Sequence, residues 1–325
     1  MNTFTALQQT IQQLIFGKSG GETSSTAGGP LQFQPLGGGS INAAYKVLTQ
    51  NNSKWFCKVN DAARFPGLFE KESRGLQLLR VQNIFRVPKV IACEIIDGHQ
   101  ILVLEWIDQD GQTQSGSQSS DHPQTQSGPQ SRAHSQTSAA PSTDAFWQLF
   151  GKQLAQLHLL PQDQFGLEED NYMGALPQDN TPSESWTEFF IQRRLEPQVK
   201  MAVEKGLLPT AAVRQFWSLY LSLPEIFPDE APSLLHGDLW SGNFLKDDWG
   251  EAVLIDPAVY RGHRAMTTLF GGFSPAFYQA YAHYYPLPTN HREQWEVANL
   301  YPLLIHLNLF GKSYLHDILH TIERF

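Results

Sequence analysis

The amino-acid sequence predicts an α+β protein in two lobes, a small lobe of five antiparallel strands with one helix and a larger, mainly helical lobe. Before residue 107, short apolar runs alternate with glycine, Asn-Asn and Asp-Gly turns, which is typical of antiparallel strands joined by hairpins. After residue 145, apolar residues recur every three or four positions, which is typical of helices that bury one face. A polar segment without either pattern separates the two regions.

Five strands and one helix are expected in the first lobe. Gly37-Gly38-Gly39 joins the first two strands, and Asp97-Gly98 has the composition of a hairpin turn between the last two. The helix is expected over Leu68–Val81, where apolar residues follow helical spacing. The chain leaves this lobe at Glu105-Trp106-Ile107. The expected strands are Leu31–Leu36, Ala43–Leu48, Trp55–Val59, Val87–Ile96 and Gln100–Trp106.

The second lobe is expected to consist of helices around one short block of loops and strands, Ser233–Tyr260. The expected domain boundaries are 1–107 for the first lobe, 108–144 for the polar segment and 145–325 for the second lobe. The expected helices are Phe146–Leu157, Trp186–Arg194, Ala211–Leu221, Ser274–Tyr284 and Trp295–Phe310.

The polar segment Gln109–Thr143 has the composition of a disordered insertion. Its 35 residues include 9 Ser, 8 Gln and 4 Thr. Such a segment buries too little apolar surface to offset the entropy lost on ordering it. We interpret it as a disordered linker, and a docking segment is the alternative. Without it, 290 of the 325 residues remain, which suits one two-lobed unit.

Charge and cysteine content exclude several classes of protein. The chain has 23 Lys and Arg against 32 Asp and Glu, a net charge of -9, which argues against a nucleic-acid binder. Cys57 and Cys93 are too few for a disulfide framework or a zinc site built from cysteines. Met1–Phe16 lacks the basic start of a signal peptide, and no run of 18 apolar residues predicts a membrane helix. We therefore expect a cytoplasmic protein that binds neither nucleic acid nor membrane, with its oligomeric state left open.

The strongest functional pattern is the run His236-Gly237-Asp238-Leu239-Trp240-Ser241-Gly242-Asn243. An Asp followed five positions later by an Asn has the spacing of a kinase catalytic loop. In such a loop the Asp238 carboxylate would accept the proton of a substrate hydroxyl, and the Asn243 carbonyl would hold a metal ion. Asp256, which follows the apolar run Ala252–Ile255, is expected to supply a second, metal-binding carboxylate.

Two features of the first lobe predict a nucleotide site. Lys58 lies among apolar residues of an expected strand, where a charge needs a partner unless the side chain faces solvent. Glu72, in the expected helix, could form with it the ion pair that orients nucleotide phosphates in kinases. In the loop Gly38-Gly39-Ser40, the glycines let backbone N–H groups approach phosphate closely because no β-carbon intervenes.

Four further residues belong to the candidate site. Glu105 and Ile107 bound the junction of the lobes, where backbone groups would read the edge of an adenine. Trp240 is expected either to line the substrate pocket or to pack as a core aromatic. His236 is expected to anchor the loop rather than to act as an acid or base.

These motifs resemble the fructosamine kinases (ketosamine 3-kinases), a branch of the aminoglycoside phosphotransferase-like kinases with a protein-kinase-like fold. Trp240 and the run Ile255-Asp256-Pro257-Ala258-Val259-Tyr260 favour this branch over choline or aminoglycoside kinases. The similarity covers most of the chain. It includes Gly37–Tyr45, Phe56–Asn60, Phe69–Leu76, Leu154–His158, Phe165-Gly166, Asp170–Gly174, Gln178, Asn180, Trp186, Arg194-Leu195, Leu269–Phe273 and His306–Gly311.

The resemblance implies ATP-dependent phosphorylation of the third-carbon hydroxyl of a ketosamine, with Mg²⁺ as the second cofactor. The product is unstable and releases its amine, which implies deglycation of small-molecule or protein-bound ketosamines. The resemblance makes Asp238 the base, Asn243 and Asp256 the metal ligands, and Lys58, held by Glu72, the phosphate ligand. A kinase for another small hydroxyl compound, such as an aminoglycoside or choline, and a pseudokinase that binds nucleotide without turnover are the alternatives.

The chain departs from the family pattern at three places. The insertion 109–143 is unusual for the family and follows directly on the junction of the lobes. Ser40 stands where some members carry a cysteine, so redox control is not expected there. Members also carry an acidic stretch of the form Glu-x-Asp-Leu after the arginine that corresponds to Arg264, whereas here Ala265-Met266-Thr267 follows directly. Because the aspartate of that stretch supports the catalytic loop, we expect a less rigid loop.

Overall fold

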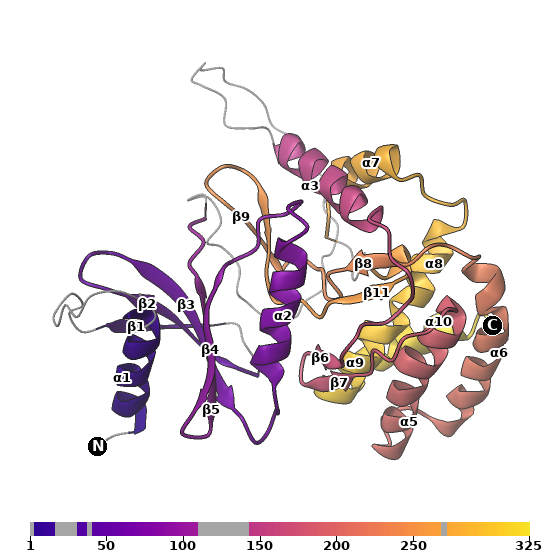
Figure 1. Ribbon diagram of the computed structural model, residues 1–325. Helices are drawn as coiled ribbons and strands as arrows, with labels where there is room; N and C mark the ends of the chain where they lie inside the picture. Colours follow the sequence, from indigo (N-terminus) through magenta and orange to yellow (C-terminus); the bar gives the residue numbers. More distant parts are fainter. Residues whose placement is uncertain (1–2, 17–30, 38–40, 110–142, 268–271) are drawn as a thin grey trace, which may run out of the picture.

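The computed structural model describes residues 3–16, 31–37, 41–109, 143–267 and 272–325, and it builds the first lobe on one antiparallel sheet (Figure 1). The strand order is β1-β2-β3-β5-β4. Asp97 and Gly98, with φ of 49° and 78°, form the turn between β4 and β5, as predicted. The strands are β1 (Gln32–Leu36), β2 (Ala43–Leu48), β3 (Lys54–Asp61), β4 (Val90–Ile96) and β5 (His99–Glu105), all within three residues of the expected ends.

Side chains alternate along the central strands, and a helix covers each face of the sheet. Cys57 and Val103 pack against Ile11 on one face, while Leu102 packs with Leu76 on the other. The covering helices are α1 (Thr3–Phe16) and α2 (Leu68–Arg80). The sequence analysis predicted α2 but not α1. Lys58 follows Cys57 in β3, so its side chain points to the other face of the sheet, the one covered by α2.

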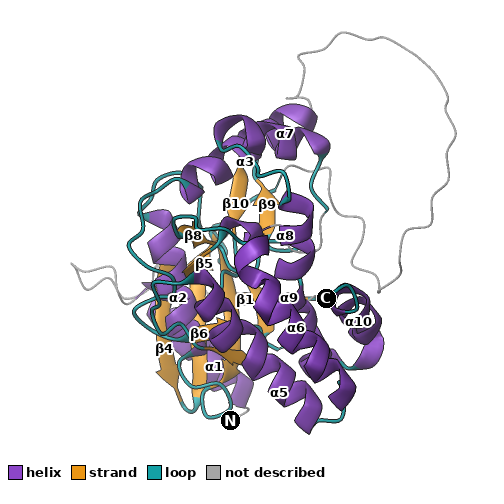
Figure 2. Cartoon of the chain, turned by 90° about the vertical axis from the view of Figure 1, so that its right-hand side faces the viewer, coloured by secondary structure: helices purple, strands orange, loops and turns teal. Residues whose placement is uncertain are grey.

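The second lobe is mainly helical, as predicted, and lies beyond α2 from the sheet (Figures 1 and 2). Its longer helices are α3 (Thr143–His158), α5 (Glu196–Glu204), α6 (Thr210–Ile226), α7 (Pro275–Tyr284), α8 (His291–Ala298), α9 (Leu300–Phe310) and α10 (Leu315–Ile322). Short strands pair as β6 (Asn171–Met173) with β7 (Leu176–Gln178), β8 (Ser233–Leu235) with β11 (Tyr260–Gly262), and β9 (Phe244–Lys246) with β10 (Ala252–Leu254). The sequence analysis did not predict β6, β7, α5 or α10.

Two of the expected helices are interrupted. Helix α4 (Trp186–Phe189) continues through a π-helical turn, Phe190–Leu195, into α5. The residues expected as one helix over 295–310 instead form α8 and α9, which meet at Asn299. Pro302 accounts for this break, because it has no N–H to donate to the carbonyl of Ala298.

One apolar core joins the two lobes. Leu76 of α2 and Leu102 of β5 belong to the same buried cluster as Phe150 of α3, Leu254 of β10 and Val259. The helix that carries Glu72 is therefore packed directly against the segment that follows β10.

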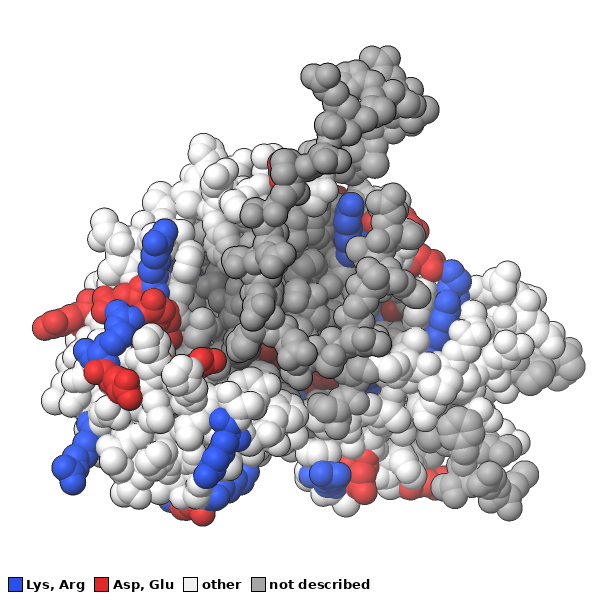
Figure 3. Space-filling view, turned by 180° about the vertical axis from the view of Figure 1, so that it is seen from behind, with Lys and Arg blue, Asp and Glu red and all other residues white. Residues whose placement is uncertain are grey.

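The surface agrees with the acidic composition. Basic and acidic side chains are mixed over the described part of the face in Figure 3, which shows no concentrated basic area among those residues. Within the described ranges, no helix is both long and apolar enough to cross a membrane.

Candidate active site

The loop His236–Asn243 joins β8 to β9 and is pressed against the segment after β10. Gly237 has a φ of 84°, and a β-carbon there would lie 1.9 Å from the Ala258 carbonyl oxygen, so only glycine fits. The backbone N–H of Ala258 donates to the carbonyl oxygen of His236 at 2.9 Å. These contacts fix the loop beside Asp256, two residues before Ala258.

The ring of His236 anchors this loop from inside. Its Nε2 lies 2.8 Å from the Ile255 carbonyl oxygen, and its Nδ1 accepts from the Asp238 backbone N–H at 3.3 Å. Burial lowers the pKa of His236 to about 4, so the ring is neutral at physiological pH. One ring nitrogen thus contacts the loop and the other the segment after β10, which favours the anchoring role over contact with a substrate.

Asp238 and Asn243 lie side by side, as their spacing predicts. The Asn243 Nδ2 donates to the Asp238 carboxylate at 2.9 Å and to the Asp238 carbonyl oxygen at 2.8 Å. Burial raises the pKa of Asp238 to about 6; the hydrogen bond from Asn243 opposes this rise, and the charge of Asp256 adds to it. A carboxylate with a pKa in this range is suited to accept a proton near neutral pH.

Lys58 forms the predicted ion pair with Glu72 and a second one with Asp256. Its Nζ lies 2.9 Å from Glu72 Oε1 and 2.6 Å from Asp256 Oδ1. Burial alone would lower the pKa of the Lys58 ammonium, but the two carboxylates hold that pKa above its usual value. Lys58 therefore stays charged and connects the first lobe to the segment after β10.

The donor groups of Asn243 and Asp256 fit a hard divalent cation. Because the Nδ2 of Asn243 is committed to Asp238, its side-chain carbonyl oxygen points elsewhere, and no described residue donates to it. The Asp256 side chain is 43% exposed and uses only one oxygen for Lys58. The Ile255 N–H donates to the Asn243 carbonyl oxygen at 3.1 Å, and this backbone hydrogen bond brings Asp256, the next residue, close to Asn243. A carboxylate and an amide oxygen are ligands that Mg²⁺ accepts in proteins.

The junction of the lobes supplies backbone rather than side-chain groups. The Glu105 carboxylate already accepts from Arg86 at 3.1 Å and from the Lys89 backbone N–H at 3.1 Å. The Ile107 N–H, by contrast, has no hydrogen-bond partner among the described residues, so it is available to an adenine edge. Of the predicted nucleotide-site residues, Gly38, Gly39 and Ser40 lie outside the described residues.

Trp240 lies beside the predicted base and is 43% exposed. Its ring folds over Gly242, where a β-carbon would lie 2.4 Å from the nearest ring carbon. Only glycine at 242 therefore leaves room for the ring in this position. An exposed aromatic face at this position suits a sugar ring better than it suits a core contact.

Gly242→Ala is expected to displace the Trp240 ring and to raise the KM for the acceptor about fivefold, with kcat changed less. Steady-state kinetics with the acceptor varied at saturating ATP would measure this. The same substitution in a Trp240→Ala background is the control and should add nothing. A rise in KM in that background as well would contradict a contact between Trp240 and the acceptor.

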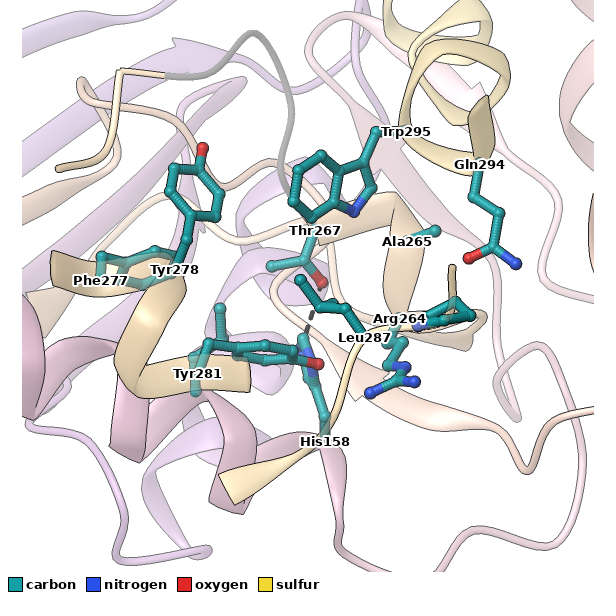
Figure 4. A pocket seen from close by; sticks show the side chains of 12 residues that line it. His158, Arg264, Ala265, Thr267, Phe277, Tyr278, Tyr281, Leu287, Gln294 and Trp295 are labelled. Atoms are coloured by element: carbon teal, nitrogen blue, oxygen red, sulfur yellow. Dashed lines mark hydrogen bonds between the residues drawn. The ribbon is translucent and has the colours of Figure 1, made fainter. Parts of the chain in front are cut away.

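Arg264 is followed directly by Ala265-Met266-Thr267, and residues 268–271 lie outside the described ones. Glu230 supplies acidic contacts at this place, 2.6 Å from Arg264 Nε and 2.9 Å from His263 Nε2. A cavity lies next to it, where Thr267 and His158 form a hydrogen bond of 3.1 Å (Figure 4). The cavity is lined from α3, α7 and α8 and not by Asp238, so it is separate from the candidate site.

The two-lobed fold, the Lys58–Glu72 pair and the Asp238–Asn243 loop define a kinase of the small-molecule phosphotransferase class. The enzyme transfers a phosphoryl group to a hydroxyl acceptor. The chain belongs to the fructosamine kinase family, whose sequence model matches residues 10–122 and 137–325. The gap between the two matched parts, residues 123–136, falls within the predicted insertion.

Relatives of this family are similar over nearly the full chain. A probable ketoamine kinase of Lactiplantibacillus plantarum is 36% identical over 292 residues, which are 87% of this chain and 90% of the relative. The mouse ketosamine-3-kinase is 32% identical, over 86% of this chain and 89% of the relative. The chloroplastic protein-ribulosamine 3-kinase of Arabidopsis thaliana is 32% identical, over 89% of this chain and 80% of the relative.

Solved structures share the fold. A candidate fructosamine-3-kinase from Thermobifida fusca has a TM-score of 0.73 at 31% identity, over 90% of this chain and 92% of that one. The amicoumacin kinase hAmiN, solved with AMP-PNP, has a TM-score of 0.54 at 14% identity, over 100% of this chain and 93% of that one. The predicted α+β, protein-kinase-like fold is therefore confirmed.

Proposed function

We propose that this protein phosphorylates the hydroxyl on the third carbon of a ketosamine, with ATP as the phosphoryl donor, and so takes part in deglycation. Family membership and relatives named as ketosamine-3-kinase and protein-ribulosamine 3-kinase support the substrate class. The observation that carries the proposal is the Asp238–Asn243 pair, held beside Asp256 and Lys58 in one two-lobed chain.

In the proposed reaction, Asp238 orients the acceptor hydroxyl and takes its proton. The carboxylate is suited to this because Asn243 fixes one of its oxygens at 2.9 Å while burial raises its pKa to about 6. Lys58, held by Glu72 at 2.9 Å, would contact the phosphates of the nucleotide. The backbone of Glu105–Ile107 and the loop of Gly38, Gly39 and Ser40 would hold the adenine and the phosphates.

Asn243 and Asp256 would hold Mg²⁺, which when bound neutralises charge that develops on the transferred phosphoryl group. Asp256 could do so with the carboxylate oxygen that does not contact Lys58. The exposure of its side chain, 43%, supports that role.

The acceptor would lie against Trp240. Its exposed ring offers a flat apolar face for a sugar, and it leaves the amine substituent to extend away from the loop. This arrangement is compatible with free and with protein-bound ketosamines. We also propose a cytoplasmic location, in keeping with a cysteine content, Cys57 and Cys93 alone, that is too small for a disulfide framework.

The test is a kinase assay on an acceptor panel. Fructosyl- and ribulosyl-amines, free and on a glycated protein, are compared with an aminoglycoside and with choline in the presence of ATP and Mg²⁺. ADP release gives the rate, and NMR of the product identifies the phosphorylated carbon. We expect turnover on ketosamines only, at carbon 3. Turnover on another acceptor, or nucleotide binding in a thermal-shift assay without turnover on any ketosamine, would overturn the proposal.

A further inference from the structure

A buried network of amide side chains lies on the β6–β7 hairpin. Asn171 and Gln178 face each other across the hairpin, and the Gln178 Nε2 donates to the Asn171 Oδ1 at 2.7 Å. Asn180, just after the hairpin, donates to the same Oδ1 at 2.9 Å. All three side chains are at most 7% exposed. Buried polar groups keep one hydrogen-bonded arrangement, because water cannot replace a lost partner and an unpaired group is costly in free energy.

The network reaches the segment behind the catalytic loop. The Asn171 Nδ2 donates to the Val259 carbonyl oxygen at 2.8 Å, and the Gln178 Nε2 lies 3.2 Å from the Ala258 carbonyl oxygen. The Tyr301 hydroxyl donates to the Gln178 Oε1 at 2.9 Å and so orients that amide. Ala258 is the residue whose backbone meets Gly237 without any free space. A shift of Gln178 is therefore passed through one residue to the loop that carries the proposed base.

The opposite end of the network is anchored by Arg194, whose side chain is fully buried. Its guanidinium donates to the Asn180 Oδ1 at 2.7 Å and lies 4.2 Å from the centre of the Tyr260 ring and 5.4 Å from that of Tyr301. No carboxylate of the described residues pairs with it. The cation is held by amide oxygens and ring faces, so its position depends on the network.

The same hairpin also holds helix α2, which carries Glu72. The Tyr172 hydroxyl donates to the Pro66 carbonyl oxygen at 3.0 Å, just before the helix. Lys71 of the helix donates to the Asp170 carbonyl oxygen at 2.5 Å. The hairpin therefore contacts both halves of the site, the helix behind Lys58 and the segment behind Asp238.

We propose that Gln178 and Tyr301 are positioning residues for phosphoryl transfer, which hold the Ala258 carbonyl and through it the Gly237–Asp238 turn of the catalytic loop. The inference rests on the proposed function for its rate measurements. It assigns no contact with substrate or nucleotide to either side chain. Their loss should therefore lower kcat and leave the KM for ATP nearly unchanged, because only the placement of Asp238 changes.

The experiment compares Tyr301→Phe, Gln178→Met and the double variant with the wild type. We expect kcat to fall about fivefold for Tyr301→Phe and about thirtyfold for Gln178→Met, since displacements below 1 Å have effects of this order. The double variant should resemble Gln178→Met alone, because the Tyr301 hydroxyl acts through Gln178. Tyr281→Phe is the matched control: it removes a buried tyrosine hydroxyl that bonds to His158 at 2.8 Å, outside the network, and should leave kcat within about twofold.

Hydrogen exchange of the peptide that covers residues 236–243 is the second measurement. It should be faster in Tyr301→Phe than in Tyr281→Phe, whatever acceptor the enzyme uses. Unchanged kcat and unchanged exchange in folded Tyr301→Phe would overturn the inference, as would additive effects in the double variant. If Gln178→Met does not fold, Tyr301→Phe decides alone. If the wild type does not phosphorylate ketosamines, the proposed function fails, and the exchange comparison still decides this inference.

Discussion

Asp238→Asn is expected to lower kcat about a thousandfold, because the variant cannot take the proton of the acceptor hydroxyl. The nearly isosteric side chain should keep the hydrogen-bonded position beside Asn243, so the KM values for ATP and for the acceptor should change little. Steady-state kinetics with both substrates varied would measure the loss. A variant with more than a tenth of the wild-type kcat would contradict the role of Asp238 as base.

The pH dependence of the wild type gives a second check on Asp238. The base acts when ionised, so kcat/KM should fall as the pH drops below about 6, where the raised pKa lies. The same shift affects stability with the opposite sign. Burial disfavours the ionised form, so the folded state loses stability as the pH rises from about 4 to about 6. At pH 7.5 Asp238→Asn should therefore be at least as stable as the wild type, which separates lost chemistry from lost folding.

Asp256→Asn is expected to lower kcat by about a thousandfold as well, through loss of the carboxylate that would hold Mg²⁺. The Mg²⁺ concentration for half-maximal rate should rise in parallel, and a titration at saturating ATP would measure it. Lys58 retains Glu72 at 2.9 Å in this variant, so the buried ammonium keeps a partner. Wild-type Mg²⁺ dependence in Asp256→Asn would contradict the metal assignment.

Asparagine is the better substitution at 256 for a conformational reason. Asp256 has a φ of 53°, in the left-handed region that asparagine and aspartate tolerate and alanine does not favour. Asp256→Ala should therefore lose the same activity and, in addition, about 1 kcal/mol of stability. Both variants lack the carboxylate charge, so the difference between their thermal unfolding midpoints measures the cost of alanine at the positive φ of residue 256.

The sequence predicted which residues of the candidate site lie together, because their placement depends on short-range spacing. Asp238 and Asn243 lie in one loop, and the strand–helix order of the first lobe was enough to pair Lys58 with Glu72. The contact of Lys58 with Asp256 joins residues 198 positions apart and was not foreseen. The roles of these residues stay predictions until the variants are measured.

What the sequence analysis missed lies in tertiary contacts. Helix α1 contains no charged residue, and its apolar residues acquire meaning only against Cys57 and Val103. The β6–β7 hairpin has strands of three residues, too short for a period of two to be recognised. The residues Asn171, Gln178 and Asn180 were noted as part of a family resemblance, but their spacing alone gives no sign that they form a buried network.

Because side chains alternate along β3, the neighbouring residues Cys57 and Lys58 are expected to be under different kinds of selection. Cys57 faces α1 and contributes to the stability of the folded protein, whereas Lys58 faces α2, where the proposed function gives it a part in the rate of catalysis. Another small apolar residue could replace Cys57 during evolution, and changes in α1 could restore any packing that is lost. Position 58 has less freedom, since the Lys58 ammonium is buried and paired with both Glu72 and Asp256. Adjacent positions in this strand should thus evolve at very different rates.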